Sequence, residues 1–275
     1  MKFIIYYFII NQSKYNYFRG AKLSIEIKDD KTLGKIYEDA LKPAVKQVGS
    51  ILEDTLKTAR LILAPLSFGG VCFDRFQKWC DRIRSNVKEE NIQTPNINIL
   101  IPTINCLSLN PDETLLGEMF FNILQSSVDK TKQKFLSPAF PKILEQLTKD
   151  EAIMLVLLKK QKYKYHTKMD LDKNNNHFIN EKIELNEFPL DKFEFQENLW
   201  LYNNHLHNLN LSGCWEYKEQ EPIYSGNEIE KGRGAISYRV PEQIGIKRFS
   251  EFRLTEFGEA FAEVCITKEC EEFLK

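Results

Sequence analysis

Three helix-start signals in succession constrain the fold of this chain more than any other feature of its sequence. Asn110-Pro111-Asp112-Glu113 combines a capping side chain, a proline at the first helical position, and carboxylates where the helix dipole is positive. Ser137-Pro138 repeats the cap and the proline, and Thr148-Lys149-Asp150-Glu151 has the spacing of a capping box. The sequence therefore predicts three helices within about fifty residues.

Periodic apolar residues extend this helical pattern toward the N-terminus. From Leu33 to Ala59 they recur at steps of three and four residues, with Pro43 expected to kink the helix or start a new one. The run from Leu61 to Phe73 has no charged residue, but it is too short to span a bilayer as a helix. We therefore predict that residues 33–158 are mainly helical and that strands lie mainly in the C-terminal third.

A second amphipathic segment follows the uncharged run. Its apolar stripe consists of Phe73, Phe76, Trp79, Cys80, Ile83 and Val87. Its basic residues are Arg75, Lys78, Arg82, Arg84 and Lys88. A core helix with a solvated basic side is the favoured interpretation. The alternative is peripheral membrane contact through residues 61–88, since aromatic anchors beside cations suit an anionic leaflet.

Residues 159–189 change in character. Five lysines between Lys159 and Lys168 are interleaved with Tyr163, Tyr165 and His166, and Asn174-Asn175-Asn176 follows. A charged linker with a solvated turn is the simpler interpretation. The alternative is nucleic-acid contact, because basic residues track a phosphate backbone and aromatic rings stack on bases.

The C-terminal part mixes helix and strand signals. We expect a helix from Leu190 to Leu209, strands at Ala235–Val240 and Ile246–Leu254, and a final helix capped by Thr255. With a first helix at residues 150–160, this order resembles a winged-helix domain. Its candidate recognition helix, Asn198–Asn210, has no lysine or arginine, which weighs against DNA binding.

These patterns define the expected fold class and domains. The chain of 275 residues is mainly α with a smaller α+β part. We expect a poorly defined extension at 1–32, a helical domain at 33–147, and a winged-helix-like α+β domain at 148–275 with a basic, polar insertion at about 159–189. The apolar run at 1–10 is half the length of a membrane span and lacks a signal cleavage site, so an uncleaved anchor, a strand and a start codon assigned too early all stay open.

Composition and cysteine spacing limit the possible chemistry. A net charge of −1 argues against chain-wide attraction to nucleic acid or anionic lipid. The six cysteines, at 72, 80, 106, 214, 265 and 270, have no CxxC or zinc-ligand spacing, so we expect free packing thiols and no metal. No cofactor-binding motif is present, and Gly69-Gly70 lacks the P-loop sequence.

No catalytic residue can be assigned from the sequence. His205 and His207 point in different directions on a helix and cannot share a metal, so we expect satisfied surface or interface histidines. Helix capping explains the carboxylates Asp112, Glu113, Asp150 and Glu151. No protease or hydrolase signature is found, so an enzyme is uncertain and the pattern leans against one.

Several short segments together resemble the Abi-alpha family, named for abortive infection in bacteriophage resistance. They are Ile36-Tyr37-Glu38-Asp39, Leu41-Lys42-Pro43-Ala44, Leu63-Ala64-Pro65-Leu66, Thr94-Pro95-Asn96, Glu118-Met119-Phe120 through Leu124, Ser126-Ser127-Val128-Asp129 and Ser137-Pro138-Ala139-Phe140. The resemblance covers about 33–158 well and the remainder loosely. It implies a bacterial anti-phage protein and brings no catalytic residues with it.

Three hypotheses follow. The leading one is a non-enzymatic effector of phage defence that acts through its helical region on a protein partner or phage component, with the C-terminal domain as sensor or partner platform. The second is a winged-helix DNA-binding regulator, and the third is an enzyme whose site assembles from residues distant in sequence. We expect a cytoplasmic protein, with peripheral contact at the inner membrane face as an alternative, and do not favour nucleic acid as partner.

Overall fold

The computed structural model describes residues 69–174, 176–225, 229–232, 235–238 and 241–274. For residues 69–74, 229–232 and 235–238 the description covers the backbone alone. The extension at 1–32, the periodic segment at 33–59 and most of the uncharged run lie outside the described residues, so those predictions stay untested.

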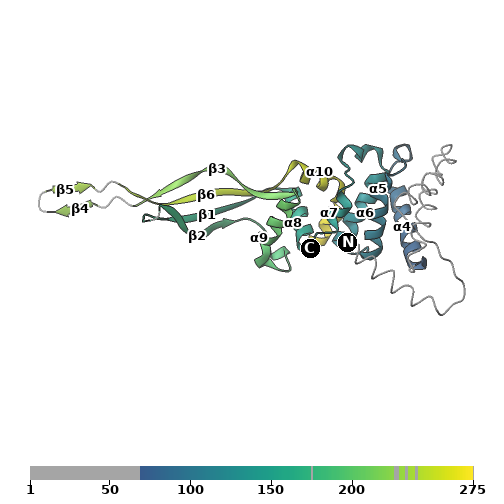
Figure 1. Ribbon diagram of the computed structural model, residues 1–275, viewed down its shortest axis with the longest axis horizontal. Coiled ribbons are helices and arrows are strands. Elements are labelled where there is room, and N and C mark those ends of the chain that lie inside the picture. The colour runs from purple at the N-terminus through teal and green to yellow at the C-terminus, as the bar shows by residue number, and fades with distance from the viewer. Residues whose placement is uncertain (1–68, 175, 226–228, 233–234, 239–240, 275) are drawn as a thin grey trace. The chain divides into compact units, whose positions relative to one another are not determined.

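The first half of the described chain is helical, as predicted. It contains α4 (Gly69–Asn86), α5 (Ile97–Leu109), α6 (Leu115–Val128), α7 (Phe140–Leu144) and α8 (Lys149–Lys160), with 3-10 turns at Glu89–Asn91 and Lys130–Phe135. Between residues 69 and 158, the β pairing in the described chain is limited to one isolated bridge between Ile92 and Asp129. α5 and α6 lie against each other and both contact α7 (Figure 1).

Helix α4 buries the apolar stripe expected of a core helix. Phe76, Trp79, Cys80 and Ile83 are each at most 3% exposed, and the stripe continues into buried Val87 beyond the helix. These side chains pack inside the protein and do not form an anchor for a membrane surface. Leu63 lies outside the described residues, and so does the side chain of Phe73.

The helix predicted at Asn110 starts later. Asn110 is the C-cap of α5, and Thr114 is the N-cap of α6, where its hydroxyl oxygen accepts a hydrogen bond from the Gly117 amide (3.1 Å). The Asn110 side chain donates to the Cys106 carbonyl oxygen (2.9 Å) and so closes the preceding helix. A cap-and-proline sequence can follow one helix as readily as it precedes another, because proline is common after a C-cap.

The other two start signals hold to within a few residues. Helix α7 begins at Phe140, shortly after Ser137, whose hydroxyl accepts from the Ala139 amide (3.3 Å). The capping box of α8 is complete: Thr148 Oγ1 accepts from the Glu151 amide (3.3 Å), and Glu151 Oε2 accepts from the Thr148 amide (2.7 Å).

A four-stranded antiparallel sheet makes up most of the second half. Its strands are β1 (Tyr163–Asp172), β2 (His177–Asn186), β3 (Ser212–Tyr224) and β6 (Gln243–Leu254), in the order β2-β1-β6-β3 (Figure 1). A separate hairpin pairs β4 (Ile229–Gly232) with β5 (Ala235–Tyr238). Helices α9 (Leu199–Asn208) and α10 (Glu256–Cys265) and 3-10 turns at Leu190–Lys192, Gln196–Asn198 and Glu269–Leu274 complete the described chain.

The basic tract predicted as a linker is a β-hairpin instead. Tyr163, Tyr165 and Thr167 are buried. Lys164, His166 and Lys168 alternate with them and face the other side of β1. This alternation with a period of two is a strand signal. It is easily overlooked in so polar a segment. Exposed turn residues 173, 174 and 176 lie between β1 and β2, with Asn176 at φ 51°.

The structure does not confirm a winged-helix domain. The first helix (α8), the last strand (β6) and the final helix (α10) match their predictions, and Thr255 caps α10 by accepting from the Gly258 amide (2.9 Å). However, β5 pairs with β4, while β6 pairs with β1 and β3. The helix predicted from Leu190 to Leu209 is shorter, because two 3-10 turns precede α9.

Helices of the first half and α10 share a core. The Asn122 side-chain amide of α6 donates to the Cys265 carbonyl oxygen (3.0 Å) and to Thr267 Oγ1 (3.2 Å). Ser126 Oγ donates to the Val264 carbonyl oxygen (3.4 Å). Helix α8 precedes the hairpin β1-β2 in the chain and contacts both α6 and β6. It therefore connects the helical core to the sheet. The division into domains at residue 147 stays a prediction.

Candidate functional site

Polar or charged groups gather at several places in the described residues, among them the junction of α4, α5 and α6, the N-terminus of α8, and a groove beside α10. Each contains residues that the sequence singled out. At each place, hydrogen bonds and exposure distinguish the groups that stabilise the fold from the groups that face solvent.

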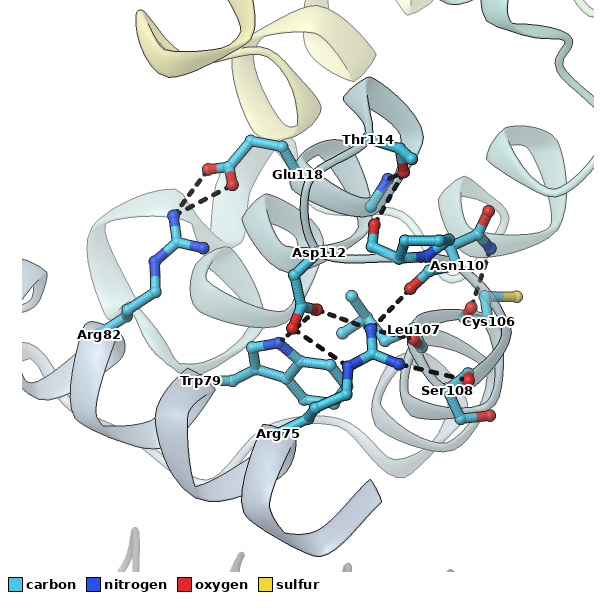
Figure 2. A network of polar contacts seen from close by, with 12 residues as sticks. Arg75, Trp79, Arg82, Cys106, Leu107, Ser108, Asn110, Asp112, Thr114 and Glu118 are labelled. Atoms are coloured by element: carbon cyan, nitrogen blue, oxygen red, sulfur yellow. Dashed lines mark hydrogen bonds and ion pairs between the residues drawn. The ribbon is translucent and has the colours of Figure 1, made fainter. Parts of the chain in front are cut away.

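The α4–α5–α6 junction is centred on Arg75, as Figure 2 shows. Its guanidinium donates to the carbonyl oxygens of Leu107 (2.9 Å), Ser108 (3.4 Å) and Asn110 (2.6 Å), the last carbonyls of α5. It also donates to both oxygens of Asp112 (2.7 and 3.1 Å). A cation at this position satisfies carbonyls that have no partner inside the helix and opposes the negative end of its dipole.

Asp112 completes this junction. Trp79 Nε1 donates to the same carboxylate (3.0 Å). Burial raises the pKa of Asp112, but the hydrogen bonds from Arg75 and Trp79 and the charges of Arg75 and Arg82 outweigh burial, so the pKa lies below its ordinary value. The sequence-based assignment of Asp112 to a helix cap is therefore wrong, because α6 begins later and the carboxylate binds α4.

Seven residues after Arg75, Arg82 connects α4 to α6. It donates to both carboxylate oxygens of Glu118 (2.8 and 3.1 Å), and its guanidinium lies 3.7 Å from the centre of the Phe121 ring (Figure 2 shows the ion pair). Glu118 is buried. These paired groups at the junction hold three helices together.

The N-terminus of α8 holds two buried carboxylates. Asp150 and Glu151 are each 3% exposed. Asp150 accepts from the amides of Glu194 and Phe195 (both 3.0 Å) and from the Tyr202 hydroxyl (2.8 Å). Capping accounts for Glu151 as predicted, but Asp150 fastens a segment more than forty residues away in sequence. No local pattern could have shown this contact.

The two histidines occupy different surroundings, as predicted. His205 Nδ1 lies 2.5 Å from Glu151 Oε1, and the ring is half-buried. The His207 ring packs against Trp215, with ring centres 5.8 Å apart. Among the described residues, no group of three or more histidine, cysteine, aspartate and glutamate side chains could hold a metal ion.

The described thiols are unsuited to nucleophilic chemistry. Cys80, Cys106, Cys214, Cys265 and Cys270 are free. Burial raises the pKa of Cys80 and of Cys106 to about 12 and that of Cys214 to about 11. Burial likewise raises the pKa of Cys265 and of Cys270. Because the thiolate is the reactive form, Cys80, Cys106, Cys265 and Cys270 act as small buried hydrophobes, and Cys214 is a half-buried, unreactive thiol.

The groove beside α10 is the best candidate for a binding site. It has a volume of about 690 Å³ and lies among the end of α8, the start of β3, the end of β6, and α10. Its lining includes Lys159, Lys162, Trp215, Arg253, Glu256 and Glu259. Arg253 stacks over the Trp215 ring at 5.2 Å. Lys162 and Arg253 both approach Glu251, at 3.3 and 3.8 Å.

Charge in the groove is divided between its walls. Lys159 donates to the carbonyl oxygens of Ala262 (2.9 Å) and Ile266 (2.6 Å), so it caps α10. Glu256 and Glu259 are exposed in the first turn of α10. One wall thus offers cations and an indole ring, and the other offers carboxylates. This arrangement suits a ligand with charges of both signs, such as a peptide segment.

These observations define a mixed α+β protein with a charged groove where its helices meet the sheet. Residues 73–265 match the family model described as Abortive infection alpha, and the chain belongs to this family, as its sequence segments indicated. No curated protein and no solved structure gives a significant match. Within the described residues, no helix is both long and apolar enough to cross a bilayer.

Proposed function

We propose that this protein serves in anti-phage defence of the abortive-infection type and acts by binding a protein partner. The groove beside α10 serves as the partner platform, and the helical region acts on the target. Membership in the Abortive infection alpha family carries the proposed role, and the matched residues, 73–265, include both the helical region and the groove.

The form of the groove supports binding. Lys162 and Arg253 have side chains that are 60% and 44% exposed, and they stand beside the Trp215 ring. Cations next to an aromatic ring, opposite carboxylates on α10, present complementary charge to a partner with both signs. Among the described residues, Lys162 and Arg253 form ion pairs only with Glu251 of β6, whereas the ion pairs of Arg75 and Arg82 hold separate helices together.

The alternatives receive less support. A winged-helix regulator would read DNA with α9, but α9 carries no lysine or arginine, and Leu199, Tyr202 and Leu206 are buried against the protein. An enzyme assembled from distant residues would place its carboxylates near the groove. There, Glu256 and Glu259 occupy a first helical turn, where the dipole accounts for them.

Phage plating and host survival test this proposal directly. Cells carrying the intact gene should form fewer plaques than cells without it, across a panel of phages. Replacing Glu256→Lys and Glu259→Lys reverses one wall of the groove and should raise plaque numbers to the level of cells lacking the gene. The matched control, Asp191→Lys with Glu197→Lys, changes two exposed carboxylates outside both the groove lining and the helical region and should retain protection.

Two results would overturn different parts of the proposal. An intact gene that protects against no phage in the panel would contradict the role in defence. Full protection by the folded groove variant would leave the role in place and remove the groove as its platform. Circular dichroism and the melting temperature of both variants verify that they fold.

A further inference from the structure

One face of the sheet carries basic and aromatic side chains that the groove does not use. Along β1, the tyrosines point to the buried face, and Lys164, His166 and Lys168 point to the opposite one, here called the open face. Neighbours in register across an antiparallel sheet share a face. The register therefore identifies the other members of the open face.

A row of three lysines crosses β2, β1 and β6 on this face, and Glu221 continues the row on β3. Lys168 on β1 is in register with Lys182 on β2 and with Lys247 on β6. Like charges directly opposite one another destabilise a sheet. Lys247 is compensated by Glu184 (2.9 Å), and Lys182 comes within only 4.0 Å of Asp170. The Lys168 side chain, in the middle, has no hydrogen bond or ion pair with another described residue. An anion on this face would remove the repulsion.

An aromatic row lies beside the lysines. The rings of His166 and Phe249 are 4.9 Å apart, and the Tyr217 hydroxyl lies 2.8 Å from His166 Nε2. Lys218 stands over the Phe249 ring at 4.5 Å. Tyr217 is 42% exposed, so its ring faces solvent. The same face continues to Trp215 and Arg253 at the groove.

We propose that the open face of the sheet binds single-stranded nucleic acid, with phosphates along the lysine row and bases stacked on the Tyr217 and His166 rings. Single strands are bound by basic grooves with aromatic platforms, because every base has a face that stacks. A duplex hides its base faces. A bilayer surface calls for protruding apolar anchors, whereas the His166 ring and the Tyr217 hydroxyl hydrogen-bond each other and Lys218 stands over the Phe249 ring. The inference is independent of the proposed function and of the groove.

The experiment measures fluorescence anisotropy of a labelled, mixed-sequence single strand of RNA, and of DNA, titrated with the full chain. Lys168→Gln with Lys182→Gln should weaken binding about tenfold and lower the salt slope by about 0.7 for each phosphate contact removed. Tyr217→Ala should weaken binding about tenfold through lost stacking and leave the salt slope unchanged. The matched control, Lys88→Gln with Lys142→Gln, replaces two exposed lysines of the helical region and should bind like the wild type.

A stability measurement separates binding from folding. Lys168→Gln relieves repulsion within the row, so its melting temperature should equal or exceed that of the wild type while its affinity falls. Three results would overturn the inference: no binding of either single strand at about 100 μM protein in low salt, a duplex bound as tightly as a single strand, or folded Lys168 and Tyr217 variants that bind like the wild type. Binding to anionic phosphatidylglycerol vesicles without oligonucleotide binding would assign the face to a membrane instead.

Discussion

Arg75 shows at the scale of one residue how a polar contact can organise three helices. Its guanidinium reaches three carbonyl oxygens at the end of α5 and both oxygens of Asp112 just before α6. Lysine has neither the fork nor the number of donors needed to replace it. The contact lies partly buried, where hydrogen bonds to charged groups are worth more than at the surface.

The Asp112 carboxylate should make stability depend on pH. Because its folded pKa lies below the ordinary value near 3.9, its contribution is complete above that value and is lost as pH falls through the folded pKa. Asp112→Asn should lower the free energy of unfolding by about 2 kcal/mol at pH 7. The difference from the wild type should shrink below about pH 4. Urea unfolding at several pH values measures it.

Asp81→Asn is the matched control for this substitution. Asp81 pairs with Arg84 at 3.1 Å, but its side chain is 60% exposed. An exposed pair of this kind contributes less than about 1 kcal/mol. A loss for Asp112→Asn that is no larger than that of the control, or that stays constant down to pH 2, would contradict the assigned role.

At the scale of elements, the packing of α10 against the segment after α9 depends on Gly258, which has no side chain. Thr255 accepts from the Gly258 amide (2.9 Å) and donates to the Asn210 carbonyl oxygen (2.5 Å), so it joins the start of α10 to the segment after α9. A Cβ on Gly258 would overlap the Leu211 carbonyl oxygen. The helix and this backbone can approach only where residue 258 is glycine.

Gly258→Ala should therefore destabilise the protein, although alanine is the better helix former. Forcing the backbone of Leu211 away should cost about 2 kcal/mol, more than the gain in helix propensity. Chemical denaturation measures the loss. Glu259→Ala, at an exposed position on the same turn, should change stability by less than about 0.5 kcal/mol. A more stable Gly258→Ala protein would show that this contact does not limit packing.

At the scale of the whole molecule, side chains from α6, α8 and α10 meet in a core that holds two of the five described thiols. Cys265 and Cys270 are fully buried, and Asn122 Nδ2 lies 3.5 Å from Cys270 Sγ. Cys80 and Cys106 are buried between the helices of the first half. The reactivity of these thiols therefore reports on global or local opening of the fold.

Native protein at pH 8 should react slowly with iodoacetamide at all five described cysteines. Their raised pKa values leave almost no thiolate at this pH, and burial blocks access to all of them except half-buried Cys214. In guanidinium chloride the same thiols should react rapidly, and none should be found in a disulfide. Mass spectrometry of alkylated peptides provides the measurement. Rapid labelling of Cys80 or Cys265 in the native protein would contradict the buried arrangement.

The sequence by itself determined the local features of this protein. The capping box at Thr148, the cap at Thr255 and the apolar stripe of α4 each depend on residues within one or two helical turns, so their patterns can be read directly. The segments that resemble Abi-alpha likewise led to the family without reference to the fold. The residues of β1 also form a local pattern, the alternation typical of a strand, but the polar composition of this segment favoured its interpretation as a linker.

Only the tertiary structure decided which distant groups meet. The groove joins α8, the start of β3, the end of β6, and α10, and the lysine row joins three strands whose register no single segment specifies. Asp112 binds Arg75, and Asp150 binds the loop before α9, because packing brings donors from far along the chain to these carboxylates. The physical reason is that local propensity acts over a few residues, whereas sheet register and helix docking depend on burial of side chains over the whole molecule.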